Sequence, residues 1–421
     1  MSPDNLDLPS AIVEDGVLAP SAQAFKAFVV RTTDNLTKGG VVMLAQFAQA
    51  GLPIIFYGGI PSTIFSWNTT EAQYISTTMN ELAQLDNVHI VQSDLAQSLL
   101  SLGIEPFARI TGNGSWYTNW HQDTETGSDY VYIYNSNMTT TTGSVEFQSV
   151  GVPYWFDAVT GEQTPVVLYN STESSTTIPL TLAGDQSMIV VFTSQPLGPL
   201  PSLHFNSVLA QDTAVDLSAA GDDLVVKAGY GSSITVSTSD GQEHSITGSS
   251  SPPFELQQWS LIVEQWAPSQ DLYESQFMTV KTNSSYEMDE LVSWQSIEGL
   301  EDVSGRGYYN SSFQWPPTNG ADGATIDFGR IFHTLQAAVN GQPLPSLDVA
   351  DARADITQQL RNGTNTVEVC IATTLINVVR PFWNQLESSG SHPRNSQVPD
   401  GQDYGLQSPV IVTPYQITLL Q

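Results

Sequence analysis

The feature that most constrains the fold is a strictly alternating segment near the C-terminus, residues 305–316. It reads GRGYYNSSFQWP. Tyr309, Ser311 and Phe313 alternate with polar residues, which is the period-two pattern of a half-buried β-strand. A segment of this kind needs neighbouring strands on both sides, so residues 254–421 are predicted to form a β-sandwich.

Turn signals around this segment favour a jelly roll. Asn340-Gly341 predicts a hairpin, because both positions tolerate a positive φ. Gly363 is expected to end a short helical turn before the next strand, at residues 366–373. Trp259, at the start of this region, begins a further apolar strand. The predicted architecture for residues 254–421 is therefore a β-jelly roll.

The N-terminal part has a different periodicity. Short apolar strands are predicted at residues 25–30, 52–57 and 88–91. Helical segments separate them, with Asn35 or Asp34, Thr69 or Thr70, and Asp94 as candidate caps. Alternation of strands and helices at this spacing predicts a parallel sheet covered on both faces. Residues 1–112 are therefore expected to form an α/β domain.

Between these parts, residues 113–253 are predicted to be all-β. Five strand-like segments lie between clusters of Gly, Asn and Ser, at 129–135, 143–149, 165–168, 175–182 and 188–192. The first 90 or so residues of this region are expected to form a β-sandwich, and the Ser- and Gly-rich strands of residues 202–250 to extend it. The chain is thus predicted to be an α/β domain followed by all-β domains.

The order of these signals resembles a known family. Segments 305–316, 326–330 (IDFGR) and 355–369 resemble the sugar-binding-like jelly roll at the C-terminus of large glycoside hydrolases. Segments 116–120 (WYTNW) and 152–162 (VPYWFDAVTGE) resemble the middle sandwich of the same proteins. The chain resembles the C-terminal, non-barrel half of fungal α-L-rhamnosidase-like proteins related to glycoside hydrolase family 106, and this implies a galactose-binding-like jelly roll at residues 254–421. The resemblance implies that the N-terminal domain is akin to the amidotransferase-like domain of β-galactosidases.

The same resemblance bears on catalysis. Members of this family hydrolyse α-L-rhamnosides with inversion of configuration. They use two carboxylates in a catalytic barrel, one acting as acid and one as base. The similarity places this chain downstream of that barrel, so we expect the barrel to be missing, and no catalytic residue can be carried over. Whether the chain is an enzyme stays open, and its catalytic residues are unknown.

Charge restricts the partners. The chain has 43 acidic and 12 basic residues, a net charge of −31. Nucleic acids and anionic membranes require a basic surface, so neither is expected as a partner. No apolar run is long enough to predict a membrane-spanning helix. The expected partner is a carbohydrate or a glycosylated small molecule.

Two features bear on the compartment, and they conflict. Eight Asn-x-Ser/Thr sequons suggest a secreted glycoprotein; they lie at Asn35, Asn68, Asn113, Asn137, Asn170, Asn283, Asn310 and Asn362. The first residues have no basic or apolar segment of a signal peptide, which favours the cytoplasm if the start is genuine. The single cysteine, Cys370, is predicted to be a buried thiol in a strand.

Conventional catalytic motifs and cofactor sites are not predicted. The six histidines do not show the spacing of a zinc site, and the acidic groups around Asp123 and Glu287 lie in polar segments where solvated carboxylates are expected. Gly58-Gly59 follows a strand but lacks the rest of a phosphate loop. No metal and no cofactor are therefore expected.

Aromatic residues are the remaining candidates for a binding site. The rings at 116–120 and 154–156 suit the core of a sandwich better than a sugar platform. Trp383 is expected in a loop between Arg380 and Asn384, and an aromatic residue there is harder to explain by packing. We predict a ligand contact at Arg380, Trp383 and Asn384.

Three functions from different classes remain open. The chain is either a glycosidase-related protein acting on or binding glycans, a non-catalytic carbohydrate-binding remnant, or a tailoring protein of a small-molecule pathway that reuses the fold. The sequons favour the first two functions, and the lack of a visible signal peptide favours the third.

Overall fold

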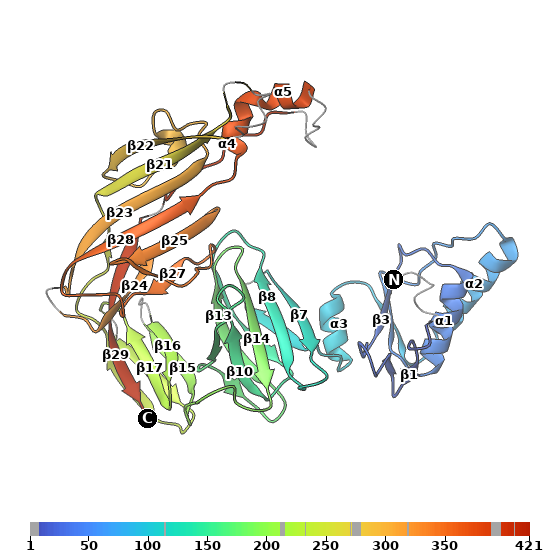
Figure 1. The fold of residues 1–421 in the computed structure, drawn as a ribbon. Helices are drawn as coiled ribbons and strands as arrows, with labels where there is room; N and C mark the ends of the chain where they lie inside the picture. The colour runs from blue at the N-terminus through green and yellow to red at the C-terminus, as the bar shows by residue number, and fades with distance from the viewer. Residues whose placement is uncertain are drawn as a thin grey trace. The chain divides into compact units, whose positions relative to one another are not determined.

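The computed structural model describes residues 8–112, 115–210, 215–231, 233–269, 271, 279–317, 320–388, 397–407 and 409–421. These residues form two compact units, 1–106 and 107–421 (Figure 1). The first unit is α/β and the second is built from β-sheets, so the predicted fold class is confirmed. Among the described residues no helix is long and apolar enough to cross a membrane.

The α/β unit contains a three-stranded parallel sheet with the order β3-β4-β5. Its strands are β3 (Phe28–Arg31), β4 (Ile54–Tyr57) and β5 (Val88–Val91), and its helices are α1 (Lys38–Gln49), α2 (Thr69–Leu82) and α3 (Leu95–Ser101). A short hairpin, β1 (Val13–Glu14) and β2 (Val17–Leu18), precedes them. The central strand β4 is continuously apolar because both of its faces are covered, as predicted for a parallel sheet.

Two of the predicted helix caps are wrong by one to three residues. Thr37, rather than Asn35 or Asp34, caps α1 by accepting from the Gly40 N–H at 3.2 Å. Asn68, rather than Thr69 or Thr70, caps α2 by accepting from the Thr70 N–H at 2.9 Å. In each case the residue with extended backbone directly before the first helical turn serves as the cap. Asp94 caps α3 as predicted.

The second unit begins with a sandwich of two sheets. One sheet has the order β11-β10-β14-β8-β7 and the other the order β12-β13-β9-β6. The strands are β6 (Ala108–Gly112), β7 (Trp116–Gln122), β8 (Asp129–Asn135), β9 (Thr141–Phe147), β10 (Val152–Phe156), β11 (Gln163–Pro165), β12 (Asn170–Ser171), β13 (Thr176–Leu182) and β14 (Ser187–Thr193). Inward residues such as Val131, Val145 and Ile178 form the core between them.

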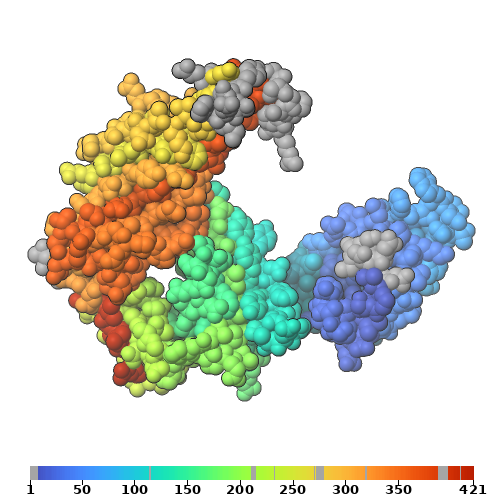
Figure 2. Space-filling model, viewed as in Figure 1, coloured from blue at the N-terminus to red at the C-terminus, as the bar shows by residue number. Residues whose placement is uncertain are grey.

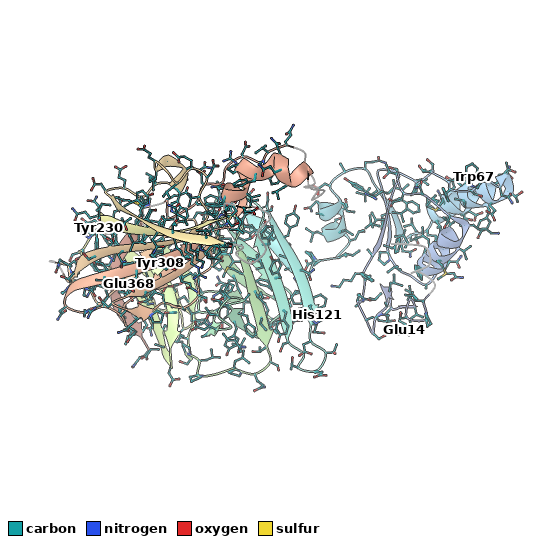
Figure 3. The ribbon with its side chains drawn as sticks, turned by 45° about the horizontal axis from the view of Figure 1, so that its top comes forward. Glu14, Trp67, His121, Tyr230, Tyr308 and Glu368 are labelled. Atoms are coloured by element: carbon teal, nitrogen blue, oxygen red, sulfur yellow. The ribbon has the colours of Figure 1, made fainter. Side chains whose placement is uncertain are left out.

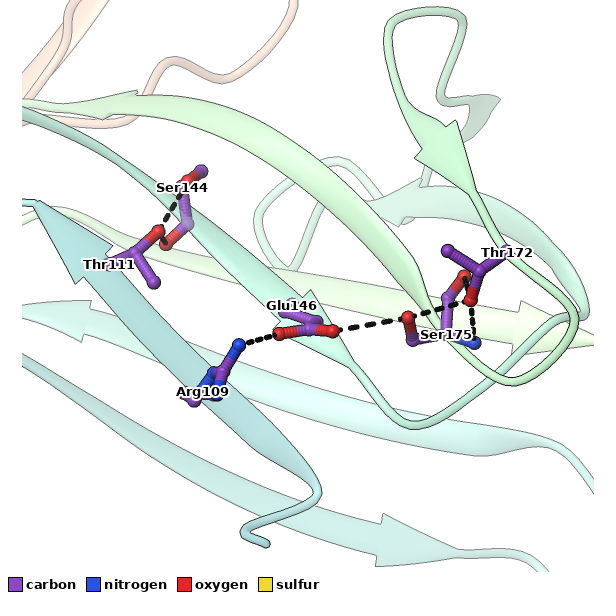
Figure 4. Close-up of polar contacts among 6 residues, drawn as sticks. All are labelled: Arg109, Thr111, Ser144, Glu146, Thr172 and Ser175. Atoms are coloured by element: carbon purple, nitrogen blue, oxygen red, sulfur yellow. Dashed lines mark hydrogen bonds and ion pairs between the residues drawn. The ribbon is translucent and has the colours of Figure 1, made fainter. Parts of the chain in front are cut away.

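Polar residues on the β12-β13-β9-β6 sheet bond to one another across neighbouring strands (Figure 4). Arg109 is ion-paired with Glu146, whose other oxygen accepts from the Ser175 hydroxyl at 3.2 Å. The Thr111 and Ser144 hydroxyl groups are hydrogen-bonded to each other, with their oxygens 2.6 Å apart. Because both oxygens of Glu146 are engaged by protein groups, this cluster is better explained as cross-strand stabilisation than as a binding site.

The jelly roll consists of two further sheets. The first has the order β22-β21-β23-β28-β25-β26. Its strands are β21 (Trp259–Ala267), β22 (Val280–Met288), β23 (Gly305–Trp315), β25 (Thr334–Val339), β26 (Gln342–Pro343) and β28 (Gly363–Ala372). The alternating segment predicted at residues 305–316 forms β23, in which buried and exposed residues alternate strictly. Tyr308 and Glu368 project from the outer face of this sheet (Figure 3).

The second jelly-roll sheet has the order β16-β17-β29-β24-β27, with β20 also pairing to β29. Its strands are β16 (Val215–Ala220), β17 (Asp223–Ala228), β20 (Phe254–Glu255), β24 (Gly323–Asp327), β27 (Arg353–Asp355) and β29 (Ile411–Leu420). Figure 2 shows the yellow-green residues of β16 and β17 beside the red strand β29. The strand pairing therefore runs across the predicted boundary at residues 253 and 254.

Residues 202–250 were expected to extend the preceding sandwich. Their described strands do not pair with those of the sandwich sheets, β6 to β14. A separate three-stranded sheet, β15 (Phe205–Ala210), β18 (Ser233–Thr238) and β19 (Glu243–Thr247), lies beside β16 and β17. Phe205, Val226 and Val236 share a core with Leu420 of β29. The C-terminal strand β29 thus contributes to two cores. Its first half pairs with β24 and its second half pairs with β17.

Other local predictions for the jelly roll can be checked directly. Asn340 and Gly341 join β25 to β26 with φ values of 55° and 74°, which confirms the hairpin turn. Cys370 lies in β28 as predicted, but on its outward side, where it is only half-buried. The prediction of a buried thiol is wrong because the alternation directs Val369 and Ile371 inward instead.

Candidate functional site

The candidate site is a hollow of about 410 Å³ on the open face of the β16-β17-β29-β24-β27 sheet. The opposite face of this sheet carries Val226, Ile326 and Val412, which are buried in the cores described above. Strand register places the polar residues together: Asp216 is opposite Lys227, and Thr325 is opposite both Thr413 and Asp355. One face of the sheet is thus packed and the other is polar and open.

Asp355 of β27 is the centre of the hydrogen bonding in this hollow. Its Oδ2 accepts from the Lys227 ammonium at 2.7 Å and from the Tyr415 hydroxyl at 2.6 Å. Its Oδ1 accepts from the backbone N–H of Thr357 at 2.9 Å. Lys227 lies 3.4 Å from a second carboxylate, Asp216. Four strands therefore contribute to one network of charged and polar groups.

The electrostatics of this network follow from its geometry. Burial alone would raise the pKa of Asp355, but hydrogen bonds from Lys227, Tyr415 and Thr357 outweigh it and lower the pKa overall. Burial alone would lower the pKa of Lys227, and its two carboxylate partners raise it instead. Burial and the bond to Asp355 both raise the pKa of Tyr415. Asp355 and Lys227 are thus charged at neutral pH, and Tyr415 is a neutral donor.

A second ion pair lies on the same face. The Arg353 guanidinium donates to both oxygens of Asp351, at 2.5 and 2.6 Å. A two-pronged contact fixes the plane of the guanidinium. The hollow thus contains two pairs of a carboxylate and a cation, Asp355 with Lys227 and Asp351 with Arg353. Such pairs can form hydrogen bonds with adjacent hydroxyl groups of a ligand.

Gly323 of β24 makes room for this arrangement. It lies opposite Tyr415, and a Cβ at this position would come within 2.2 Å of the Thr357 hydroxyl and 2.6 Å of the Tyr415 hydroxyl. The Tyr415 ring, only 3% exposed, occupies the space that a side chain would fill. Lys227 lies over this ring at 5.5 Å.

The ligand contact predicted from the sequence lies elsewhere. Arg380, Trp383 and Asn384 do not line this hollow. They were expected in a loop, and this is wrong. The helix α4 (Ile376–Val379) is followed directly by a 3-10 turn, η3 (Arg380–Phe382), which begins at Arg380. The helix α5 (Trp383–Ser388) follows and begins at Trp383. The apolar positions of residues 376–386 follow helical spacing, a periodicity that a loop would lack, and this accounts for the difference.

The side chains of this helical segment have defined surroundings. Arg380 donates to Asp302 and to the Pro399 carbonyl, each at 2.9 Å. The indole N–H of Trp383 is buried without a hydrogen-bond partner in the described part of the chain, and Asn384 is exposed. The proposed ligand contact at these three residues stays a prediction.

Other sequence-predicted candidates have structural roles or are untested. Trp116 and Tyr154 are buried in the sandwich, as expected for core residues, but the core prediction is wrong for Tyr117 and Trp120, which are 65% and 41% exposed. Of the eight sequons, Asn113 lies outside the described residues; Asn137 is half-buried, and the exposed ones are Asn35, Asn68, Asn170, Asn283, Asn310 and Asn362. Glycosylation and the compartment stay predictions.

The shifted pKa values of the described carboxylates differ from that of the general acid in glycoside hydrolysis. A general acid for that reaction needs a raised pKa. Where the pKa of a described carboxylate is shifted, it is lowered, as at Asp34, Asp123, Asp240, Glu264 and Asp355. In the hollow, the Lys227 ammonium donates to Asp355 at 2.7 Å and stabilises the ionised form of this carboxylate.

Sequence reasoning missed the hollow because its members are far apart in the chain. Lys227 and Asp355 are separated by 128 positions, and Tyr415 lies a further 60 beyond Asp355. One signal was present: Lys227 is one of only four lysines and stands inside an apolar strand. A lysine in that context requires a carboxylate partner, but nothing local indicates which one.

Comparison with known proteins shows what the chain is similar to. No family model matches it. A rhamnosidase from Novosphingobium sp. PP1Y superposes with a TM-score of 0.56 at 19% identity, over 96% of this chain and 35% of that one. A putative β-glucuronidase from Formosa agariphila is 27% identical over 124 residues, 28% of this chain and 11% of that protein.

A β-glucuronidase from Faecalibacterium prausnitzii covers 38% of this chain with a TM-score of only 0.26 at 15% identity, which is too low to carry an argument. The chain thus has the fold of about a third of the rhamnosidase, 35% of its length. Together the two informative matches support a glycoside hydrolase-like relationship.

Proposed function

We propose that this chain is a glycan-binding part of a glycoside hydrolase-like protein, and that the sheet-face hollow binds an uncharged sugar. The observation that carries the proposal is the Lys227–Asp355–Tyr415 network, which lines the hollow and leaves the side chains of Lys227 and Asp355 19% and 35% exposed. The fold shared with a rhamnosidase supports a rhamnose-type ligand.

Charge favours a neutral ligand over an anionic one. Three carboxylates and two cations line the hollow: Asp216, Asp351 and Asp355 against Lys227 and Arg353. The surrounding protein is strongly acidic, with a net charge of −31. A uronic acid or a sulfated sugar would therefore be repelled, whereas hydroxyl groups can donate to carboxylates and accept from the ammonium.

The role of the chain is better described as binding than as hydrolysis. Asp355 is ion-paired with Lys227 and its pKa is lowered, so this residue is not available as a general acid at neutral pH. We expect the purified chain not to hydrolyse an aryl α-L-rhamnoside above the background of a heat-inactivated sample. A fungal source and the particular hydrolase family are part of this proposal and rest on the sequence resemblance.

Calorimetric titration with L-rhamnose and with an α-L-rhamnosyl disaccharide tests the proposal. Lys227→Met should weaken binding about 10- to 100-fold, the value of one hydrogen bond to a charged group. Lys281→Met is the matched control, since Lys281 lies on the other jelly-roll sheet and should not affect binding. If the unaltered chain binds neither sugar, or if both variants weaken binding equally, the proposed site is wrong.

A further inference from the structure

A second hollow, of about 360 Å³, lies next to the first. Asp351 lines both of them. One side of the second hollow is formed by the end of β24, at Asp327, and by the turn that follows, which includes Arg330. The other side is formed by sandwich loops that include Thr139 and Gly184. The loops of the sandwich thus approach the jelly roll at one end of the candidate site.

Strand register places residues that line the two hollows side by side on one face of the sheet. Thr325 is opposite Asp355 in the first hollow, and the same two strands place Asp327 opposite Arg353 two residues further along. Residues two apart in a strand lie on the same face. Asp327, which lines the second hollow, therefore projects from the same face as the Lys227–Asp355 network.

Arg330 is held in position at the second hollow by two contacts. Its Nη2 lies 2.9 Å from Oδ2 of Asp185 in the sandwich, and the Tyr134 hydroxyl donates to the other oxygen of this carboxylate at 3.2 Å. The guanidinium also lies 5.4 Å from the centre of the Phe332 ring, which is 57% exposed. A guanidinium has five N–H donors, so these contacts leave capacity for ligand hydroxyls.

Gly184 allows the sandwich loop to approach closely. A Cβ at this position would lie 2.4 Å from the carbonyl carbon and oxygen of Met138. Any larger residue would separate the two loops that form the sandwich side of the hollow. This close contact thus shapes the sandwich side of the hollow.

We propose that the two hollows form one groove that binds a neutral oligosaccharide, with the Lys227 network holding one sugar residue and Arg330, supported by Phe332, holding a neighbouring one. The inference rests on the proposed function and adds the length of the ligand to it. The lining of the whole groove contains four carboxylates, Asp216, Asp327, Asp351 and Asp355, against three cations, Lys227, Arg330 and Arg353. A neutral chain of sugars suits this balance better than a polyanionic one.

The test is the dependence of affinity on ligand length, measured by calorimetry on the full chain. The probes are L-rhamnose, a neutral rhamnosyl tetrasaccharide, and a tetrasaccharide of the same length that contains a uronic acid. The unaltered chain should bind the neutral tetrasaccharide at least about 10-fold more tightly than the monosaccharide, because a second set of contacts is engaged. The charged tetrasaccharide should bind less tightly than the neutral one.

Variants separate the two ends of the groove. Arg330→Met and Phe332→Ala should remove the gain with length and leave monosaccharide affinity unchanged, whereas Lys227→Met should weaken binding of both ligands. Arg306→Met and Tyr117→Ala are controls, because Arg306 lies on the outer face of the other jelly-roll sheet and the Tyr117 ring is similarly exposed, at 65%. Phe332→Ala leaves the Arg330–Asp185 ion pair in place, so it remains informative if Arg330→Met disturbs folding.

Two outcomes would overturn the inference. If L-rhamnose binds but affinity does not rise with length, or if Arg330→Met and Phe332→Ala bind the tetrasaccharide as tightly as the unaltered chain, the second hollow is not a subsite and the proposed function stands alone. If neither neutral ligand binds the unaltered chain, the proposed function fails and the extended groove fails with it.

Discussion

At the scale of single residues, the candidate site depends on one carboxylate with several donors. Asp355 accepts from Lys227, Tyr415 and the Thr357 backbone, and these bonds lower its pKa although burial alone would raise it. A lowered pKa in the folded state means that the ionised carboxylate stabilises the fold. The contribution is fully present above the unfolded pKa, near 4, and is lost as the pH falls through the lower folded value.

Asp355→Asn should therefore reduce stability by about 1 kcal/mol at pH 7, a modest value because the side chain is 35% exposed and its ion pair is partly screened. The difference from the unaltered chain should shrink below about pH 4, as the native carboxylate itself becomes protonated. Thermal unfolding across a pH series measures this. Asp216→Asn is the control and should change little, since Asp216 is more exposed and farther from Lys227. A difference between the Asp355 variant and the unaltered chain that is constant from pH 3 to 7 would contradict the assignment.

At the scale of elements, the pairing of β24 with β29 shapes the site. Gly323 is opposite Tyr415, and the absence of a side chain at Gly323 allows the Tyr415 ring to lie beneath Lys227. The glycine therefore acts through a close approach of two strands, which is one of the few reasons for a glycine inside a strand.

Gly323→Ala should destabilise unit 107–421 by about 1–3 kcal/mol, because the new methyl group would overlap the Thr357 and Tyr415 hydroxyls. The midpoint of urea unfolding measures the effect. Gly198→Ala is a suitable control, since a Cβ at Gly198 meets no atom within 4 Å. If the two variants unfold at the same urea concentration, Tyr415 is not held as tightly as the packing indicates.

At the scale of the whole molecule, the chain contains two compact units with separate cores. Residues such as Leu44, Phe56 and Ile75 form the core of the α/β unit, and the cores of the sandwich and of the jelly roll lie in unit 107–421. The connection after α3 contains Glu105 and Pro106, both exposed. Exposed connections between cores are where proteases cut first.

Limited digestion with a glutamate-specific protease should accordingly cleave after Glu105 before other sites and leave two folded fragments. Mass spectrometry identifies the cut, and circular dichroism of the separated fragments shows whether each retains its structure. Early cleavage within α1 or α2, or between β21 and β23, would mean that the units are not independently stable.

The sequence by itself determined the elements whose signals are local. The alternation of residues 305–315 specifies β23, and the dipeptide Asn340-Gly341 specifies the hairpin between β25 and β26. The segment at 88–91 is a strand with the predicted bounds. In each case neighbouring residues carry the information, because side-chain periodicity and the φ of a turn are properties of a few consecutive positions.

Only the tertiary structure decided where the candidate site lies. The residues around Lys227, Asp355 and Tyr415 indicate strands, but not that β17, β29, β24 and β27 are neighbours in one sheet. That order is set by long-range strand pairing and by the packing of two cores on the opposite face. The sequence contains no local trace of such pairing, since every strand presents the same backbone donors and acceptors to whichever partner the fold brings beside it.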